Sequence, residues 1–241
     1  MKKNEIIIIA GLPRSGTSLV CQMLSAAGIR VAGDYPMFEP DEMLESPDAA
    51  FISTYEGGAV KLIDPDHHIL PKGYAYRIIF LSRSKRQQAL STAKFMIAMD
   101  MVTNGRCFTD AGLEKMRESL IGDEKLALAE LWKHGCPIHR IRFEDLIGQA
   151  AVAVSSLADF LGIDQNLVGS MVAAIRPRPH GALNYPGLLE VELMQEQEAR
   201  DGKSPAYDPL RCECKFPGVV APCGYCKDGD YCMEDEQSKP L

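Results

Sequence analysis

The sequence predicts an α/β fold, a three-layer sandwich with a central, mostly parallel sheet and a phosphate cradle near the N-terminus. Residues 6–9 are a run of isoleucines that Gly11 and Pro13 stop, and a helical pattern follows them. This order predicts a buried strand, a tight loop and a helix start. Further short apolar runs then alternate with amphipathic helical stretches, an order typical of a parallel sheet covered by helices on both faces.

The loop between the first strand and the first helix predicts anion binding. Gly11 and Gly16 let the backbone turn sharply, and the amides of residues 15–18 would point into the loop at the positive end of a helix. The spacing fits the start of the P-loop pattern G-x-x-x-x-G-K-[ST], but Thr17 stands where that pattern has lysine. Arg14 is the available replacement, because its planar guanidinium suits a tetrahedral oxyanion.

This loop resembles that of a known family. The segment Pro13-Arg14-Ser15-Gly16-Thr17-Ser18 resembles the 5′-phosphosulfate loop of the sulfotransferases, most closely in their bacterial and protein-tyrosine branches. The resemblance implies that these six residues bind 3′-phosphoadenosine 5′-phosphosulfate (PAPS), the sulfuryl donor, whose product is adenosine 3′,5′-bisphosphate (PAP).

The expected elements follow in order along the chain. A helix of about eleven residues ends near Gly28, and a second begins after Ser46-Pro47-Asp48. The remaining strands are expected at Ala59–Ile63, Tyr76–Arg83 and Cys136–Phe143, and the remaining helices from Gln87 onward and at Leu113–Trp132, Val152–Leu161 and Leu167–Ile175.

The composition limits the class of protein. The 241 residues are 46% hydrophobic and 24% charged, which is enough for one core plus an appendage. We expect a domain over residues 1–200 and a cysteine-rich tail over 201–241. The net charge of −7 argues against a general nucleic-acid binder. No apolar run approaches the roughly 20 residues of a membrane span, so a cytoplasmic protein is expected.

A carboxylate is the first candidate for the catalytic base. Asp34 follows Gly33 and lies twenty residues beyond Arg14, where the resemblance to the protein-tyrosine branch implies a catalytic glutamate. The extended segment before Asp34 would bring it back toward the cradle. A neighbouring glutamate is a rival base, and so are His67 and His68, because the cytosolic branch of the family uses a histidine.

Two cationic sets complete the predicted site. Lys61 is a charge within an apolar strand, and the resemblance implies that it neutralises the departing phosphate; the alternative is an edge-strand lysine that reaches solvent. Arg83 closes a strand and Ser91 follows eight residues later, the spacing with which the family holds the 3′-phosphate. The resemblance also implies that Arg176 or Arg178 closes over that phosphate; the alternative is that both belong to a plain interdomain loop.

Two further segments are interpreted as structural. Residues 142–146 (Arg-Phe-Glu-Asp-Leu) resemble a family motif, and we expect their two acids to accept the first amides of the next helix. The tail contains C-x-C and C-x-x-C pairs with little apolar bulk. A four-thiolate zinc site is the preferred interpretation, with disulfides or disorder as alternatives; the ligands would be Cys212, Cys214, Cys223 and Cys226.

The functional hypothesis is direct in-line transfer of a sulfuryl group from PAPS to a hydroxyl or amine of a small-molecule or protein acceptor. Arg14, Asp34 and Lys61 would be the catalytic residues. One alternative is a P-loop small-molecule kinase or NTPase, which needs the lysine that Thr17 replaces. Another is a non-catalytic binding module on a nucleotide-binding fold, with the tail as its interaction site.

Overall fold

A parallel four-stranded sheet forms the centre of the molecule. The computed structural model describes residues 5–43, 46–98, 109–176 and 200. All strand pairs in the described sheet are parallel, in the order β2-β1-β3-β4. The predicted α/β class with a parallel sheet is confirmed. The strands are β1 (Glu5–Gly11), β2 (Ala59–Ile63), β3 (Ala75–Ser82) and β4 (Ile138–Arg142).

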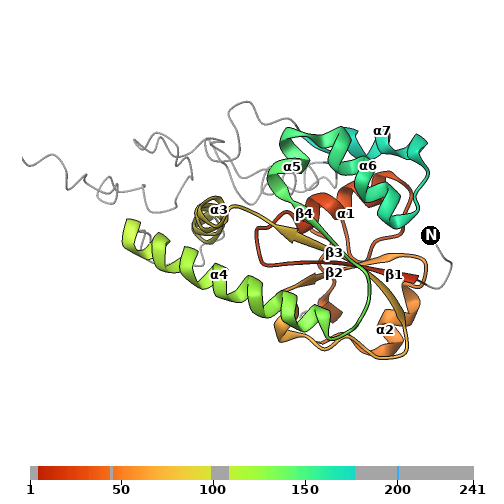
Figure 1. Cartoon of the computed structure of the whole chain (residues 1–241), viewed down its shortest axis with the longest axis horizontal. Coiled ribbons are helices and arrows are strands. Elements are labelled where there is room, and N and C mark those ends of the chain that lie inside the picture. Colours follow the sequence, from red (N-terminus) through yellow and green to blue (C-terminus); the bar gives the residue numbers. More distant parts are fainter. Residues whose placement is uncertain (1–4, 44–45, 99–108, 177–199, 201–241) are drawn as a thin grey trace, which may run out of the picture.

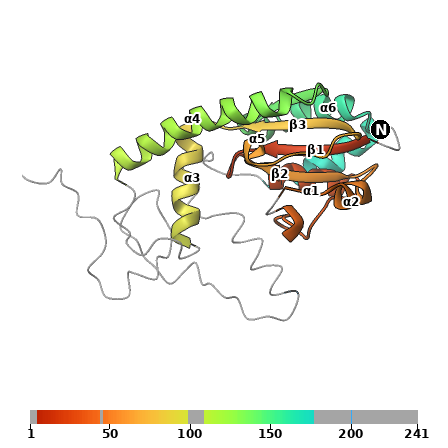
Figure 2. The ribbon, with the colours of Figure 1, turned by 90° about the horizontal axis from the view of Figure 1, so that it is seen from below.

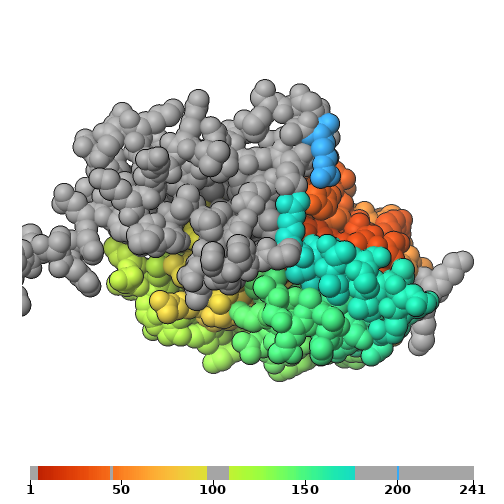
Figure 3. Space-filling view, turned by 90° about the horizontal axis from the view of Figure 1, so that it is seen from above, coloured from red at the N-terminus to blue at the C-terminus, as the bar shows by residue number. Residues whose placement is uncertain are grey.

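Helices cover both faces of this sheet, as Figure 1 shows. Ile7 and Ile9 pack in one apolar cluster and Ile6 and Ile8 in another, as expected for successive side chains of a strand that is buried on both faces. The first face is covered by α1 (Thr17–Ala26), α5 (Phe143–Gly148), α6 (Ala150–Leu161) and α7 (Val168–Ala173), and the second by α2 (Ala49–Thr54) and α4 (Asp110–Trp132). Figure 3 shows α5, α6 and α7 forming the surface over the first face.

One helix lies apart from these layers. Helix α3 (Lys85–Ala98) follows β3 and stands crosswise beyond the carboxyl ends of the strands (Figure 2). In parallel α/β sheets, ligands bind at this edge. The fold therefore places α3 beside the loop that joins β1 to α1.

Most expected elements are confirmed within a few residues, including the helix predicted at Leu167–Ile175, which is the six-residue α7. A short 3₁₀ turn, η4 (Gln165–Leu167), precedes it. The Asp164 carboxylate accepts a hydrogen bond from the Asn166 amide at 2.9 Å, which closes a tight turn before the helix. Two more 3₁₀ turns are η1 (Asp41–Met43) and η2 (Pro65–His67).

Several predictions lie outside the described residues. They are the cysteine-rich tail over residues 201–241 with its four zinc ligands, and Arg178. Within the part of the chain that the structure describes, no helix is long and apolar enough to cross a membrane.

Candidate functional site

The loop between β1 and α1 has the tight geometry of a phosphate cradle. Gly16 caps α1 with a φ of 108°, and Arg14 also has a positive φ, of 64°. A Cβ on Gly16 would lie 2.5 Å from the Phe143 ring. Only glycine combines this backbone conformation with this lack of space.

The interior of the cradle contains a polar atom without a partner. Ser15 is 1% exposed, and its Oγ has no hydrogen-bond partner among the described residues. A Cβ on Gly11 would lie 2.5 Å from this oxygen. Because the first amides of a helix also lack intrahelical acceptors, the residues present suit an oxyanion such as the 5′-phosphosulfate of PAPS.

Two side chains near the start of α3 support the cradle through its backbone carbonyls. Arg83 Nη1 donates to the Arg14 carbonyl at 3.0 Å, and Gln88 Nε2 donates to the Pro13 carbonyl at 2.7 Å. Gln88 is fully buried. Gln88 was not predicted as a site residue; its only indication in the sequence is that it is a polar residue at the start of an apolar helical stripe.

Arg14 links the cradle to the predicted 3′-phosphate residue on α3. Its Nε donates to Ser91 Oγ at 3.3 Å, and its guanidinium carbon lies 4.7 Å from the centre of the Phe95 ring. The structure therefore brings Arg14, Arg83 and Ser91 together, although 77 positions separate the first from the last. A nucleotide held at both ends requires this proximity.

A second lysine, which the sequence analysis did not single out, lies near this group. Lys94 is one turn beyond Ser91 on α3 and is 8% exposed. Burial, and then the positive charge of Arg83, lower the pKa of Lys94. Lys94 and Arg83 are both buried, and two buried cations that repel each other make the site electropositive, which favours an anionic ligand.

The Arg-Phe-Glu-Asp-Leu segment, which was expected to be only structural, also contacts residues of the site. The Phe143 ring packs against Gly16, and its centre lies 4.4 Å from the Arg83 guanidinium carbon. The expectation for Glu144 was wrong. Its Oε1 accepts from the Ser84 amide at 2.8 Å, just before α3, and no side chain caps α5. Ser82 pairs with Arg142 in the parallel ladder of β3 with β4, so Glu144, two residues further on, lies beside Ser84.

Lys61 is buried at the mouth of the cradle. Its side chain is 2% exposed, so the edge-strand alternative, a lysine that reaches solvent, is wrong even though β2 is an edge strand. Lys61 Nζ donates to Ser18 Oγ and to the Met37 carbonyl, both at 2.8 Å. It also forms an ion pair with Glu39 Oε1. Glu39 was not named among the predicted site residues.

The other predicted site residues lie in different surroundings. Asp34 is exposed, and its backbone carbonyl accepts from the Phe38 amide at 2.7 Å. His67 is exposed beside Asp66, with 3.6 Å between Nε2 and Oδ2. His68 Nδ1 is buried and has no hydrogen-bond partner in the described part of the chain. Arg176 is partly buried just after α7.

A strained aspartate lies beside the cradle. Asp64 follows β2 with a φ of 48°, and its amide donates to the Gly11 carbonyl at 3.2 Å. Burial raises the pKa of its carboxyl group, and the negative charges of Asp66 and Asp123 add to this increase, while His67 and His68 oppose it. The ionised carboxylate is therefore disfavoured in the folded state.

We expect Asp64→Asn to raise the melting temperature at pH 7. Asparagine has no charge to desolvate and adopts positive φ readily. Because the folded pKa of Asp64 lies above its unfolded value, the wild type regains stability as the pH falls through the folded pKa. The difference in melting temperature should thus shrink toward pH 4 in a thermal scan. A difference that does not change with pH would contradict this explanation.

The comparisons with known proteins identify the family. The model of the sulfotransferase domain matches residues 4–176. The chain belongs to the sulfotransferase family. A comparison with curated proteins finds no match.

Solved structures show similarity at low sequence identity. Mouse sulfotransferase SULT7A1 complexed with PAP is 14% identical over 73% of this chain and 65% of that one, with a TM-score of 0.44. Retinol dehydratase with androsterone and inactive cofactor PAP is 15% identical over 83% of this chain and 68% of that one, with a TM-score of 0.48. Retinol dehydratase with retinol and PAP is 14% identical over 80% of this chain and 71% of that one. Its TM-score of 0.50 supports a shared fold. This chain thus spans less than two thirds of the length of the mouse protein.

Proposed function

We propose that the chain transfers a sulfuryl group from PAPS to a hydroxyl or amine acceptor by direct in-line displacement. The observation that carries this proposal is the contact between the two predicted binding groups. Arg83 donates to the Arg14 carbonyl of the cradle, and Arg14 donates to Ser91. Membership of the sulfotransferase family supports the same activity.

The residues divide between the two ends of the donor. The amides of residues 15–18, with Ser15 Oγ, would hold the 5′ group, and Arg83 with Ser91 would hold the 3′-phosphate, with Arg176 and Arg178 closing over it. When bound, PAPS supplies the activated sulfuryl group. Arg14 and Lys61 would offset the negative charge that develops on the leaving phosphate, and their fixed positions avoid reorganisation during the reaction.

A matched pair of nucleotides tests the 3′-phosphate site. PAP and adenosine 5′-monophosphate (AMP) differ only in the 3′-phosphate, so calorimetry on both isolates its contribution. We expect the wild type to prefer PAP over AMP, and Ser91→Ala to reduce this preference about tenfold, because a hydrogen bond to a charged group contributes about 1.5–3 kcal/mol. Arg83→Ala should reduce the preference further.

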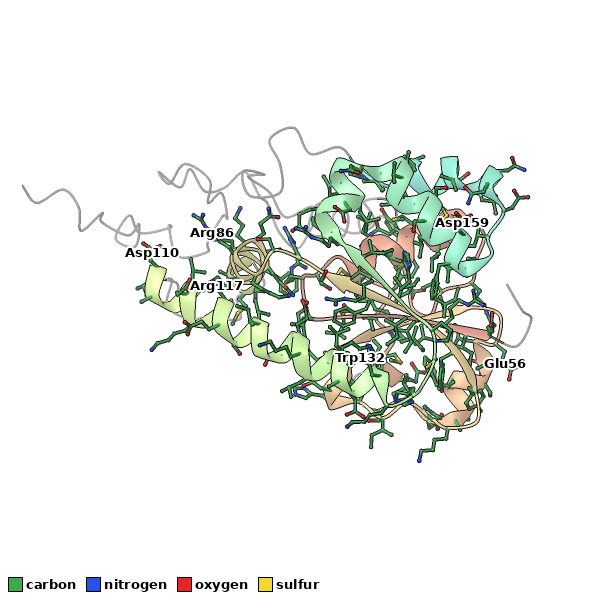
Figure 4. All side chains as sticks on the ribbon, viewed as in Figure 1. Glu56, Arg86, Asp110, Arg117, Trp132 and Asp159 are labelled. Atoms are coloured by element: carbon green, nitrogen blue, oxygen red, sulfur yellow. The ribbon has the colours of Figure 1, made fainter. Side chains whose placement is uncertain are left out.

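The control is an arginine on the same helix. Arg86 is exposed on the side of α3 that faces away from the sheet (Figure 4). Arg86→Ala should keep the wild-type preference for PAP. Equal affinity of the wild type for PAP and AMP would contradict the proposed site, and much tighter binding of ATP with magnesium would favour the kinase alternative.

We propose further that residues 201–241 form a separate tail in which Cys212, Cys214, Cys223 and Cys226 hold a structural zinc ion. The support is the spacing of these thiols, which suits tetrahedral coordination, and the scarcity of apolar residues around them. The tail lies outside the described residues, so this zinc site stays a prediction.

A further inference from the structure

The carboxylate that contacts the cradle's lysine is Glu39 rather than the predicted base Asp34. Glu39 Oε1 pairs with Lys61 Nζ, and the same nitrogen donates to Ser18 Oγ in the first turn of α1. The Glu39 side chain is 46% exposed, whereas that of Lys61 is 2% exposed. Glu39 thus faces solvent on one side and the cradle's buried cation on the other.

The loop that carries Glu39, residues 33–43, is fixed in place and is called the strap below. Its backbone folds back tightly, because a Cβ on Gly33 would lie 2.8 Å from the Glu39 nitrogen. Phe38 is 4% exposed and anchors the strap in the core beside α1. Gln22 Nε2 on α1 donates to the Pro36 carbonyl at 3.1 Å. Glu39 is therefore held at its position at the cradle mouth, and does not depend on its own side chain to stay there.

We propose that Glu39 accepts the proton of the attacking acceptor and couples this proton transfer to Lys61. This inference rests on the proposed sulfuryl transfer. The acceptor O–H or N–H bond breaks and its proton goes to Glu39. The acceptor atom forms a bond to sulfur, and the bond between sulfur and the 5′-phosphate oxygen breaks, with its electron pair staying on that oxygen.

The ion pair explains why a glutamate at this position serves the reaction. While Glu39 is ionised, it neutralises part of the charge of Lys61. When Glu39 takes up the proton it becomes neutral, and the full positive charge of Lys61 then acts on the cradle as negative charge develops on the leaving oxygen. Deprotonation of the acceptor and stabilisation of the leaving group are thereby linked through one contact.

Glu39→Gln tests this inference with two readouts, neither of which needs a known acceptor. The first is PAP affinity by calorimetry. Removing a negative charge beside Lys61 should leave PAP binding intact or make it tighter, by up to about tenfold. The second is release of PAP from PAPS with water as the acceptor, which should fall about a hundredfold or more because general-base catalysis is lost.

Two variants on the same strap complete the experiment. Glu42 is exposed in η1, and Glu42→Gln makes the same charge change three residues away, so it should keep wild-type PAP affinity and PAP release. Asp34→Asn removes the rival carboxylate, and comparing its PAP release with that of Glu39→Gln decides which carboxylate is the base. We expect the larger loss, about a hundredfold or more, in Glu39→Gln.

The outcomes separate this inference from the proposed function. Loss of PAP release in Asp34→Asn but not in Glu39→Gln would overturn the assignment of Glu39. Loss of PAP binding in Glu39→Gln would also overturn it, because the residue would then be structural. Failure of the wild type to bind PAP or to release it from PAPS would instead overturn the proposed function itself.

Discussion

Gly16→Ala is expected to abolish nucleotide binding and to destabilise the fold by about 2–6 kcal/mol. A side chain at a φ of 108° is strained, which costs about 1–3 kcal/mol, and the new Cβ would lie 2.5 Å from the Phe143 ring, which adds an overpacking cost of similar size. Relief of the clash would shift the first turn of α1 or the Phe143 ring, and with the ring the Arg83 guanidinium that stacks on it. Chemical denaturation and PAP calorimetry measure the two effects.

Gly28 provides the matched control. It too has a positive φ, of 78°, but a Cβ there would have no atom within 4 Å. Gly28→Ala should therefore show only the backbone strain, about 1–2 kcal/mol, with PAP affinity unchanged. If both variants lost the same stability and both bound PAP, the close contact between Gly16 and Phe143 would not be needed for the cradle to bind the nucleotide.

Lys61→Met is expected to remove turnover while the protein stays folded. Methionine keeps most of the buried stem, and replacing a buried charge by an apolar side chain is often neutral or stabilising. The charge near Ser18 is lost, so PAP affinity should fall about 10- to 100-fold. Release of PAP from PAPS should fall further, by about 100-fold or more, because the charge acts mainly as the leaving group departs.

An exposed lysine controls for the loss of a paired charge. Lys133 also forms an ion pair, with Glu130, but its side chain is 68% exposed at the end of α4. Lys133→Met should leave both PAP affinity and turnover unchanged. A Lys61→Met variant with normal turnover would show that Lys61 has only a structural role.

The sequence allowed the sheet and the cradle to be predicted because both depend on local patterns. Runs of β-branched residues marked the strands, and the spacing of Gly11 and Gly16 marked the loop between β1 and α1. Arg83 and Ser91 could be named from their spacing just after β3 and along α3, and the structure places both in contact with Arg14. Their shared role at the 3′-phosphate stays a prediction.

The contacts made by loops could not be predicted in the same way. Glu39 reaches Lys61 because residues 33–43 fold back on themselves, and sequence spacing does not encode such a path. Gln88 and Phe143 act on the cradle across tertiary contacts between separate elements. Asp34 was chosen by counting residues from Arg14. In the structure, its backbone carbonyl accepts a hydrogen bond within the turn that orients Glu39.

A crystal structure of the protein with PAP tests the central claim most directly, namely that one nucleotide is held at both ends by the Arg14 cradle and the Arg83–Ser91 pair. We expect the 5′-phosphate on the amides of residues 15–18, the 3′-phosphate within hydrogen-bond distance of Arg83 and Ser91, and Arg14 turned away from Ser91 toward the 5′-phosphate. A complex in which the 3′-phosphate lies away from α3, with the Arg14 to Ser91 hydrogen bond retained, would contradict the account.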